Sequence, residues 1–459
     1  MNAKQSVKSV LTAAVQPTAN HRGFPKRIIS RLGASRKLTL WILYLLCPVI
    51  LSGCTKRQPT SPTPQMDIEP KFWVRVLLLD DVSGCTLKIP SSFSIVNLQQ
   101  QSLQACFDRV DVPIRAKISA DRITIAGWSS VGSEVVIAPD EPHIFNLNGE
   151  DYRGKLKLIL NPDANSLDAV NLVPPESYLA GVVGAEMPDY WEPAALRAQT
   201  IAARTYCWYI KKQFGGKRSW DVLKTQANQV YRGIAAESAQ VWDAVNKTHG
   251  KVLVCEHNNG TKDVFPAYYS SICGGHTENS QNMFGGDLFK PLTGVECPYC
   301  RDAARNKFFF WPTVQIDKSE VTKRLLKRYP TLERLGKITN IIPVQQSNYG
   351  RFSRLTKLKL IGSTGKFDFL RAEDLRLVID PTGRKLRSTI CQITDANEDS
   401  QTQNDTQGNS DKLVFSSGRG YGHGVGMCQC GAQVMARKRK TTEQIIFYYY
   451  PGSKFESIY

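Results

Sequence analysis

Residues 178–207, YLAGVVGAEMPDYWEPAALRAQTIAARTYC, predict two helices joined by a short turn. The first helix ends near Glu186, because Pro188 follows two positions later and proline interrupts a helix. The second helix begins near Pro193, whose missing N–H is harmless in a first turn, and it is filled with Ala, Leu, Gln and Arg, which are strong helix formers. We therefore predict a helical centre within residues 166–310.

Strand-like segments flank this pair of helices. Residues 71–165 contain short runs of β-branched and aromatic residues separated by polar turns, a pattern typical of strands. After the helices, the runs KVLVCE at 251–256 and VFPAYYSS at 264–271 also predict strands. The chain thus has a strand-rich N-terminal part before its helical centre.

The rest of the chain completes an α+β fold. Residues 311–396 mix an amphipathic helical run with strand-like runs and read as an α+β insertion. Residues 397–411 contain no apolar side chain and predict a disordered loop. Residues 412–459 form a C-terminal segment that begins glycine-rich, ends helical and is expected to return to the centre.

The N-terminus has the pattern of an export signal. Eight Lys or Arg residues and no acidic residue precede the apolar run at 38–51, which is short for a membrane span and is interrupted by Pro48. The LSGC tetrapeptide that follows resembles a bacterial lipobox and predicts lipidation of Cys54. We interpret residues 1–53 as a lipoprotein signal peptide and residues 54–70 as a tether. Ordinary secretion or an uncleaved anchor is the alternative.

The charge of the chain is consistent with an envelope protein that meets anionic polymers. The net charge is +18, of which the first 53 residues supply +8, leaving +10 after their removal. A basic exported protein is attracted to peptidoglycan, wall phosphates or lipid headgroups. Export argues against nucleic acid as a partner, and a simply solvated basic surface is the alternative. We expect a lipid-anchored location in the cell envelope.

Three segments carry the motifs that indicate a function. They are residues 178–207, quoted above, residues 268–286, YYSSICGGHTENSQNMFGG, and residues 418–436, GRGYGHGVGMCQCGAQVMA. In wording and in order they resemble the SpoIID/LytB family, whose members include a sporulation lytic transglycosylase and amidase-enhancer proteins. The resemblance extends over most of residues 72–455 and includes QVYRG at 229–233.

Glu186 is the acidic residue of the E-M-P motif, and the resemblance implies that it is catalytic. Read without the family, it is a carboxyl group at the end of a largely apolar helix. Such surroundings would raise its pKa and keep a proton available near neutral pH, as a general acid requires. A solvated carboxylate at a helix end is the alternative.

The resemblance implies two alternative functions on peptidoglycan glycan strands. A lytic transglycosylase would use Glu186 to protonate the oxygen between MurNAc and GlcNAc, then to deprotonate the C6 hydroxyl of MurNAc, so no second protein base is needed. An amidase enhancer would bind glycan and stimulate a cell-wall amidase without cutting. A zinc hydrolase is disfavoured, because the sequence has no H-E-x-x-H or comparable motif.

Five further side chains are candidates for substrate contact. Arg419, Tyr421 and His423 stand among glycines at alternate positions, where the backbone can approach a ligand closely. A purely structural turn is the alternative for this segment. Arg204 and Tyr206, on the second predicted helix, are weaker candidates because either residue could simply brace the fold.

The cysteines predict either a zinc site or disulfide bonds. Cys273-Gly-Gly-His276 and Cys297-Pro-Tyr-Cys300 are two ligand pairs whose spacing suits a tetrahedral zinc ion. Four protein ligands would leave no open position, so the predicted zinc is structural. Disulfide pairing is one alternative, because exported proteins commonly oxidise their cysteines, and a free-thiol C-x2-C pair is the other.

Three motif positions depart from the family pattern. Cys428 and Cys430 stand where relatives usually have Ser and an aromatic residue, and either could pair with Cys207 or Cys391. Tyr269 stands where relatives often have His. That difference argues against any metal or catalytic model that needs a histidine at this position.

Overall fold

The computed structural model of the chain describes residues 72–97, 102–130, 132–162, 165–257, 260–304, 306–350, 352–396 and 411–459. These residues belong to one compact unit. The predicted signal peptide, the lipidation site Cys54, the tether and nearly all of the loop predicted at 397–411 lie outside the described residues. None of the described helices combines the length and apolar character needed to cross a membrane.

The N-terminal part consists of two antiparallel sheets. The larger has the strand order β13-β1-β12-β11-β8-β3-β4 and the smaller β10-β9-β2-β5-β6-β7, with β13 pairing parallel to β1 at one edge. The strands are β1 Val74–Val82, β2 Gly84–Ile89, β3 Phe93–Asn97, β4 Ser102–Phe107, β5 Val110–Ser119, β6 Arg122–Ile125, β7 Trp128–Ser129, β8 Glu134–Pro139, β9 Ile144–Leu147, β10 Glu150–Arg153, β11 Lys155–Leu160, β12 Leu167–Val173 and β13 Val222–Leu223.

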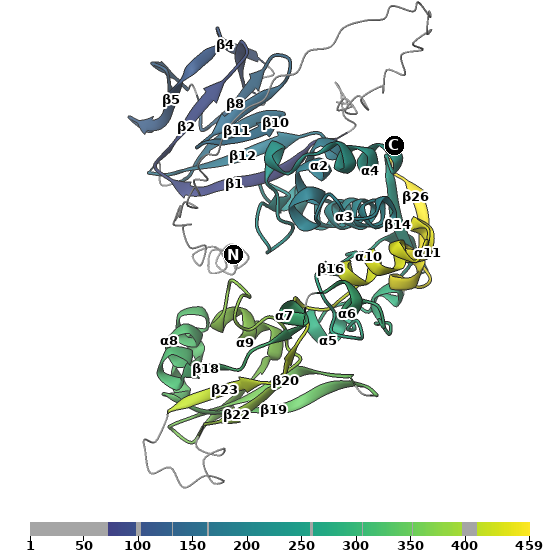
Figure 1. The fold of residues 1–459 in the computed structure, drawn as a ribbon. Helices are drawn as coiled ribbons and strands as arrows, with labels where there is room; N and C mark the ends of the chain where they lie inside the picture. The colour runs from purple at the N-terminus through teal and green to yellow at the C-terminus, as the bar shows by residue number, and fades with distance from the viewer. Residues whose placement is uncertain are drawn as a thin grey trace, which may run out of the picture. The chain divides into compact units, whose positions relative to one another are not determined.

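Helices α2 and α3 lie directly after this part and form the centre of the unit (Figure 1). Both begin with a proline at the first or second helical position, as the sequence predicted for α3. One continuous core contains apolar residues of both sheets and of α2, α3 and α4. The elements here are α2 Pro175–Glu186, α3 Pro193–Phe214, η1 Gly215–Lys217, η2 Gly233–Ala236, α4 Ala239–Lys247, β14 Lys251–Glu256, β15 Lys262–Val264, β16 Tyr269–Ser270, α5 Ser280–Phe284, η3 Lys290–Leu292, α6 Cys300–Ala303 and α7 Asn306–Phe309.

An insertion with its own apolar core follows. Helices α8 and α9 cover the buried side of the β19-β20-β21 sheet, while β18, β23 and β22 form a second small sheet. The elements are β17 Phe310–Trp311, β18 Val314–Asp317, α8 Lys318–Arg328, η4 Pro330–Leu335, β19 Ile338–Tyr349, β20 Phe352–Gly362, β21 Phe367–Arg371, α9 Ala372–Ile379, β22 Gln392–Asp395 and β23 Lys412–Ser416.

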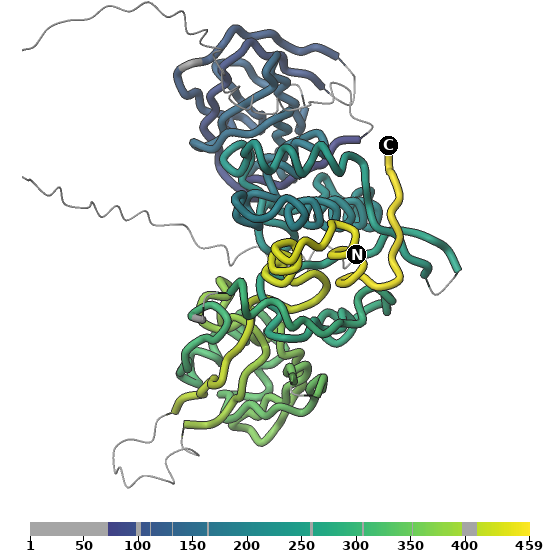
Figure 2. Tube along the Cα trace, turned by 45° about the vertical axis from the view of Figure 1, so that its right-hand side comes forward, coloured from purple at the N-terminus to yellow at the C-terminus, as the bar shows by residue number. Residues whose placement is uncertain are grey.

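The last segment returns to the helical centre, as Figure 2 shows in yellow. It contains β24 Gly418–Arg419, β25 Met427–Cys428, α10 Gln429–Arg437, α11 Thr442–Tyr449 and β26 Lys454–Ser457. Strand β25 pairs parallel to β16, and β26 pairs antiparallel to β14. The C-terminal segment therefore completes two sheets that residues 251–270 begin.

The predicted α+β class is confirmed, and the strand β14 spans the run predicted from KVLVCE. The run VFPAYYSS is not one strand: β15 ends at Val264 and β16 begins only at Tyr269. Pro266 explains the gap, because it lacks the N–H that a continuous sheet ladder would use.

Candidate active site

Glu186 lies where α2 ends, and the residue is partly exposed although its carboxyl group is largely buried. The backbone N–H of Val230 donates a hydrogen bond to Oε1 at 2.8 Å. The side chain of Gln429 makes a second hydrogen bond with the carboxyl, and the guanidinium of Arg232 adds a favourable charge. These partners come from parts of the chain that are far from Glu186 in sequence.

Two glycines in the GVVG run of α2 let the segment with Val230 approach this helix. A methyl group at Gly184 would lie 1.9 Å from the carbonyl oxygen of Ala236, and one at Gly181 would lie 2.5 Å from the ring of Tyr231. Residues three apart share one face of a helix, so both glycines open the same side of α2. The small residues thereby set the position of the N–H that reaches the carboxyl group.

Burial raises the pKa of Glu186 from 4.5 to about 7, which agrees with the expectation from its apolar surroundings. The hydrogen bonds from Val230 and Gln429 oppose this shift but do not cancel it. Its place at a helix C-terminus, where backbone carbonyls accumulate negative charge, also disfavours the carboxylate. Near neutral pH both protonation states are therefore well populated, as a group that donates and then accepts a proton requires.

The three motif segments meet at this carboxyl group. Glu186 belongs to the first, and Gln429 belongs to the third. The second contributes Tyr269, whose pKa is raised well above its usual value by burial and by the nearby charge of Glu186. The hydroxyl of Tyr269 accepts a hydrogen bond from Gln229 at 2.9 Å. The parallel pairing of Tyr269 with Met427 brings the second and third segments side by side.

Arg204, a weaker candidate for substrate contact, is instead buried and holds neighbouring elements together. Its side chain is 2% exposed and forms a two-pronged ion pair with Glu176, with Nη2 2.5 Å from Oε2. Nη1 also donates to the carbonyl of Lys251 at 3.0 Å. The guanidinium is fully enclosed between α2, α3 and β14, so the substrate-contact prediction is corrected here.

Tyr206, on the same helix, is also mostly buried. Its hydroxyl accepts a hydrogen bond from the amide of Asn228 at 3.2 Å, and its ring lies 5.6 Å from that of Tyr268. Asn228 directly precedes the Gln229-Val230 pair that reaches the candidate site. The geometry assigns Tyr206 to the support of that segment, and its contact with substrate stays a prediction.

The three predicted substrate contacts of the glycine-rich segment lie against the second segment and the insertion. The guanidinium of Arg419 lies 5.1 Å from the centre of the Phe352 ring. The backbone of Tyr421 exchanges two hydrogen bonds with Ile272. His423 packs edge-on against Phe284, with ring centres 5.2 Å apart. Contact with substrate stays a prediction for Arg419, Tyr421 and His423.

Burial lowers the pKa of His423 to about 4, so its imidazole is neutral at neutral pH. Its Nδ1 accepts a hydrogen bond from the N–H of Val425 at 3.0 Å. The neutral ring cannot serve as a general acid in that pH range. The carboxyl of Glu186, by contrast, has a pKa of about 7.

The glycines of this segment allow close packing of protein against protein. Gly426 has φ of 70°, and a methyl group there would lie 1.9 Å from the carbonyl oxygen of Tyr268. Gly424 is approached by the guanidinium of Arg354 from the insertion. Close packing within the protein therefore explains why Gly424 and Gly426 are glycines, as the alternative of a purely structural turn expects, and no ligand is needed.

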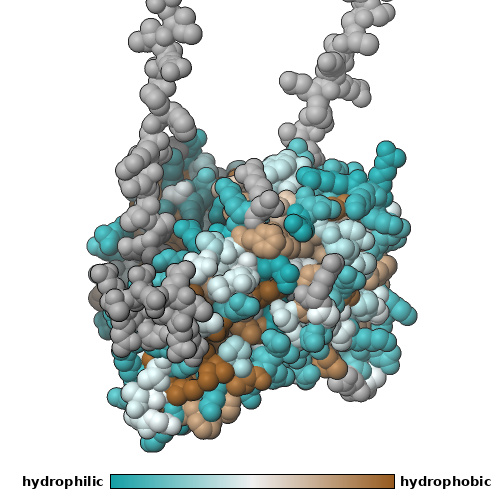
Figure 3. Space-filling view, turned by 60° about the horizontal axis from the view of Figure 1, so that its bottom comes forward, coloured by the Kyte–Doolittle hydropathy of each residue, from teal (hydrophilic) through white to brown (hydrophobic). Residues whose placement is uncertain are grey.

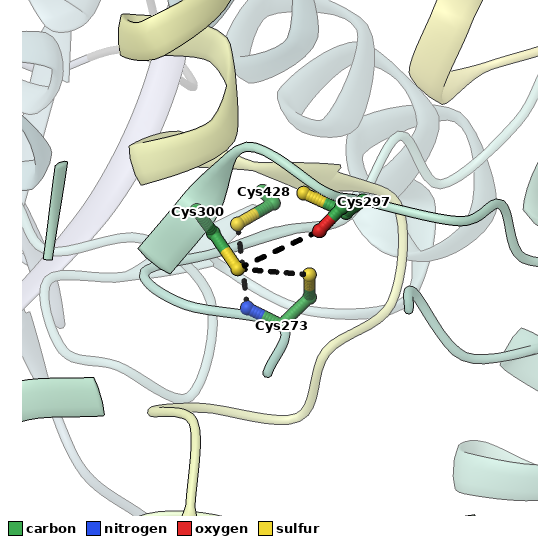
Figure 4. Close-up of side chains that lie close together, drawn as sticks. All are labelled: Cys273, Cys297, Cys300 and Cys428. Carbon is green, nitrogen blue, oxygen red and sulfur yellow. Dashed lines mark hydrogen bonds between the residues drawn. The ribbon is translucent and has the colours of Figure 1, made fainter. Parts of the chain in front are cut away.

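Cys273, Cys297, Cys300 and Cys428 form a buried four-thiol cluster, whose Sγ atoms all lie within 4.8 Å of one another. Figure 4 shows them converging from three separate stretches of chain. The Sγ atoms of Cys273 and Cys300 are 3.8 Å apart, far more than the roughly 2.05 Å of a disulfide. Four thiolates around zinc at about 2.3 Å would be separated by about 3.8 Å, so the donor set fits a tetrahedral metal.

The cluster corrects the predicted ligand set, because Cys428 occupies the place assigned to His276. The His276 ring is instead stacked on Tyr349 at 3.7 Å between ring centres, and its Nδ1 lies 2.6 Å from the carbonyl oxygen of Thr277. Steric space for the cluster comes from Gly431, where a methyl group would lie 2.8 Å from the Sγ of Cys297.

The disulfide alternative is not found among the described residues, because all ten of their cysteines are free. This includes Cys207, Cys391 and Cys430, so the suggested pairing of the C-x-C motif with Cys207 or Cys391 is corrected. Cys428 is committed to the four-thiol cluster, and the N–H of Cys273 donates to its Sγ at 3.3 Å.

Two groups that form hydrogen bonds with the carboxyl of Glu186 were not predicted from the sequence. They are the N–H of Val230 and the side chain of Gln429. Val230 lies in the quoted QVYRG motif and Gln429 in the MCQCG run, so both were visible as motif members without an assigned role. The sequence also contained a signal for Cys428 as a ligand, because the C-x-C motif at 428–430 is a third cysteine motif in addition to the C-x2-H and C-x2-C pairs.

Comparisons with known proteins place these observations in a family context. Residues 163–255 match a family model described as stage II sporulation protein, and residues 296–426 match one described as a domain of unknown function. An uncharacterized protein of Brachyspira hyodysenteriae is 30% identical over 314 residues, which cover 67% of this chain and 73% of that protein.

Two Bacillus subtilis proteins are also similar. Stage II sporulation protein D is 28% identical over 301 residues, covering 62% of this chain and 75% of that protein. The amidase enhancer is 26% identical over 370 residues, covering 74% of this chain but 49% of that protein. The match therefore spans about half the length of the amidase enhancer.

Proposed function

Because this chain belongs to the SpoIID/LytB family, we propose that it cuts the glycan strands of peptidoglycan as a lytic transglycosylase, with Glu186 as acid and then base. The observation that carries the proposal is the pKa of this carboxyl group, about 7, on a residue that is partly exposed. A protonated carboxyl group near neutral pH is the group needed to cleave a glycosidic bond.

The surroundings of Glu186 favour a mechanism with one carboxyl group. The groups that shift its pKa are an N–H, an amide and a guanidinium, and no second carboxyl is among them within the described residues. Hydrolases that activate water on a glycoside generally place two carboxyl groups across the scissile bond. A lytic transglycosylase needs only one, because the sugar supplies its own nucleophile.

The proposed reaction proceeds in two proton transfers. The protonated Glu186 donates its proton to the glycosidic oxygen as the bond from C1 of MurNAc to that oxygen breaks, and the GlcNAc hydroxyl leaves. The resulting carboxylate takes the proton of the C6 hydroxyl while O6 forms a bond to C1. The products are a 1,6-anhydroMurNAc end and the regenerated carboxyl group, and no water is consumed.

The site offers partners suited to each state of the carboxyl. The Val230 N–H and the Gln429 amide stabilise the carboxylate after the first transfer, while burial keeps the protonated form available for the next cycle. Val230 directly precedes Tyr231, which packs closely against Gly181 of α2, and Gln429 is the first residue of α10. The balance between burial and these hydrogen bonds sets the pKa near the operating pH.

We also propose that the four-thiol cluster binds a structural zinc ion. Cys273, Cys297, Cys300 and Cys428 would supply all four ligands, so the ion would offer no open position for chemistry. The hydroxyl of Tyr449, 3.2 Å from the Sγ of Cys297, would be an outer partner of one ligand. The ion would fix the start of α10, which carries Gln429.

We place this activity in the cell envelope, with export directed by residues 1–53 and lipid anchoring at Cys54. The basic and apolar pattern of that segment supports the proposal, as do the sporulation and amidase-enhancer names of the relatives. The expected partners are glycan strands and the membrane that holds the anchor. A cell-wall amidase is the expected partner under the alternative function.

The experiment is incubation of the full chain with purified, peptide-free glycan strands, followed by mass spectrometry of the products. We expect 1,6-anhydro ends from the wild type and none above background from Glu186→Gln. Glu192→Gln is the matched control, because this exposed carboxyl lies six residues away and its side chain makes no capping hydrogen bond. It should retain the wild-type rate.

The amidase-enhancer alternative predicts a different result in the same experiment. Intact glycan that is bound by the wild type, together with stimulation of a purified cell-wall amidase, would replace the transglycosylase proposal. The similarity to a protein named amidase enhancer favours this second candidate. Loss of cleavage in Glu192→Gln as well would show that the Glu186 result is not specific.

A further inference from the structure

The β19-β20-β21 sheet of the insertion has one covered and one uncovered face. Ile341, Leu358 and Leu360 belong to its buried side and pack in a core with apolar residues of α8 and α9. Side chains alternate between the two faces of a strand, so the intervening positions point away from these helices. On a solvated face such positions are usually polar.

The uncovered face carries exposed apolar side chains instead. Ile342 on β19 is 41% exposed, and Phe367 and Phe369 on β21 are 48% and 46% exposed. Val344, at an irregularity in the pairing of β19 with β20, is 46% exposed beside them. The register joins these strands through β20, because Lys359 pairs with both Ile342 and Phe369. Figure 3, which views the end of the molecule with the insertion, shows apolar residues gathered in one patch. Contiguous exposed apolar surface of this kind marks an interaction site.

Two lysines lie in the middle of this face. The Nζ of Lys359 is 4.0 Å from the centre of the Phe367 ring, and the Nζ of Lys357 is 4.8 Å from that of Phe369. No ion pair among the residues that the structure describes involves either lysine. Asp368 lies between Phe367 and Phe369 on β21, so its side chain points to the opposite face of the sheet, where it forms an ion pair with Arg334. The two lysines of this apolar face therefore have no neutralising carboxylate among the residues that the structure describes.

We propose that the face formed by Ile342, Val344, Lys357, Lys359, Phe367 and Phe369 docks on an anionic lipid surface. Phenylalanine and aliphatic side chains would enter the boundary between headgroups and acyl chains, while the ammonium groups contact lipid phosphates. This proposal is independent of the activity assigned to Glu186.

The composition of the face favours lipid over other anionic partners. Lysine is depleted at the centres of protein interfaces, whereas long lysine side chains extend readily to headgroups from an apolar surface. A sugar ring would need a free aromatic face for stacking. Here each phenylalanine ring has an ammonium group above it, and the aliphatic Ile342 and Val344 offer no such surface.

The test is co-sedimentation of the full chain with vesicles of phosphatidylglycerol and, separately, of phosphatidylcholine. The apolar run at 38–51 stays in every variant, so any contribution from it is constant. We expect wild-type binding to phosphatidylglycerol to be stronger than to phosphatidylcholine. Replacing both lysines, in Lys357→Gln with Lys359→Gln, should weaken binding to phosphatidylglycerol about 30-fold. Phe367→Ser with Phe369→Ser should weaken it at least tenfold.

The matched control is Phe214→Ser with Lys217→Gln. Phe214 is 41% exposed with the Nζ of Lys217 6.0 Å from its ring centre, but this pair lies at the end of α3, away from the insertion. The control should bind vesicles like the wild type. Equal losses in control and test variants would overturn the proposal. A second result would also overturn it: all variants bind vesicles like the wild type, but the test variants lose binding to purified peptidoglycan. That result would assign the face to glycan binding.

Discussion

At the scale of single residues, Glu186 has a property that its sequence context indicated in part. An apolar helix that ends at an acidic residue predicts a raised pKa, and that direction agrees with the structure. The size of the shift depends on Val230 and Gln429, which oppose it from positions 44 and 243 residues away in sequence. No local pattern fixes such contacts, because they are set by the packing of α2 and α10.

The raised pKa predicts that Glu186 destabilises the folded protein at alkaline pH. The folded state keeps the proton up to about pH 7, whereas the unfolded chain loses it near 4.5, so the free energy of unfolding falls as pH rises between these values. Glu186→Gln removes this loss. We expect the variant to be more stable than the wild type by about 3 kcal/mol at pH 8 and equally stable at pH 4.

Urea denaturation of the wild type and Glu186→Gln at the two pH values measures this difference. Glu192→Gln, at an exposed position, should show no comparable dependence on pH. A stability difference that is the same at pH 4 and pH 8 would contradict the assigned pKa. In the cleavage assay, the same pKa predicts that the wild-type rate declines as pH rises above about 7, because the general acid is lost.

At the scale of elements, the helices, the glycine-rich segment and the cysteine turns differed in how well they could be predicted. Prolines and strong helix formers correctly marked the end of α2 at Glu186 and the start of α3 at Pro193. The cysteine spacing correctly indicated a cluster but gave the wrong fourth member. A spacing rule compares neighbours in sequence, and Cys428 reaches the cluster only because β25 pairs with β16.

The corrected ligand set predicts which variants lose the metal. Cys428→Ser should purify with less than one zinc per chain and unfold at a temperature on the order of 10 °C lower than the wild type. His276→Ala should keep its zinc, because this ring is stacked on Tyr349 outside the cluster. Elemental analysis and thermal unfolding of the full chain measure both. Zinc lost from His276→Ala and kept by Cys428→Ser would restore the histidine-containing site.

At the scale of the whole described unit, a buried polar cluster fastens the insertion to the helical centre. Glu278, which is fully buried, accepts hydrogen bonds from Ser347 at 2.5 Å and Tyr349 at 2.8 Å, both on β19. Arg354 on β20 lies 3.9 Å from its carboxylate and also donates to the carbonyl of Cys273 at 2.8 Å. The sequence offered no pattern for this contact, since it joins polar residues from separate segments.

Breaking this cluster should cost far more than breaking an exposed ion pair. Arg354→Met would leave the carboxylate of Glu278 buried beside an apolar chain, and we expect a loss of about 3 to 5 kcal/mol in the free energy of unfolding. Arg334→Met is the matched control, because its ion pair with Asp368 is solvent-exposed, and it should lose less than about 1 kcal/mol. Urea denaturation distinguishes the two; similar losses would contradict a fastening role for the cluster.

The parallel pairing of β16 with β25 has a consequence for biosynthesis. The contact between Cys273 and Cys428 joins residues 155 positions apart, with the whole insertion between them. Gln429 cannot meet Glu186 until nearly all of the polypeptide has been synthesised, and pairings of such long range form late. A nascent or truncated chain would thus lack both the Gln429 contact with Glu186 and the fourth thiol of the cluster.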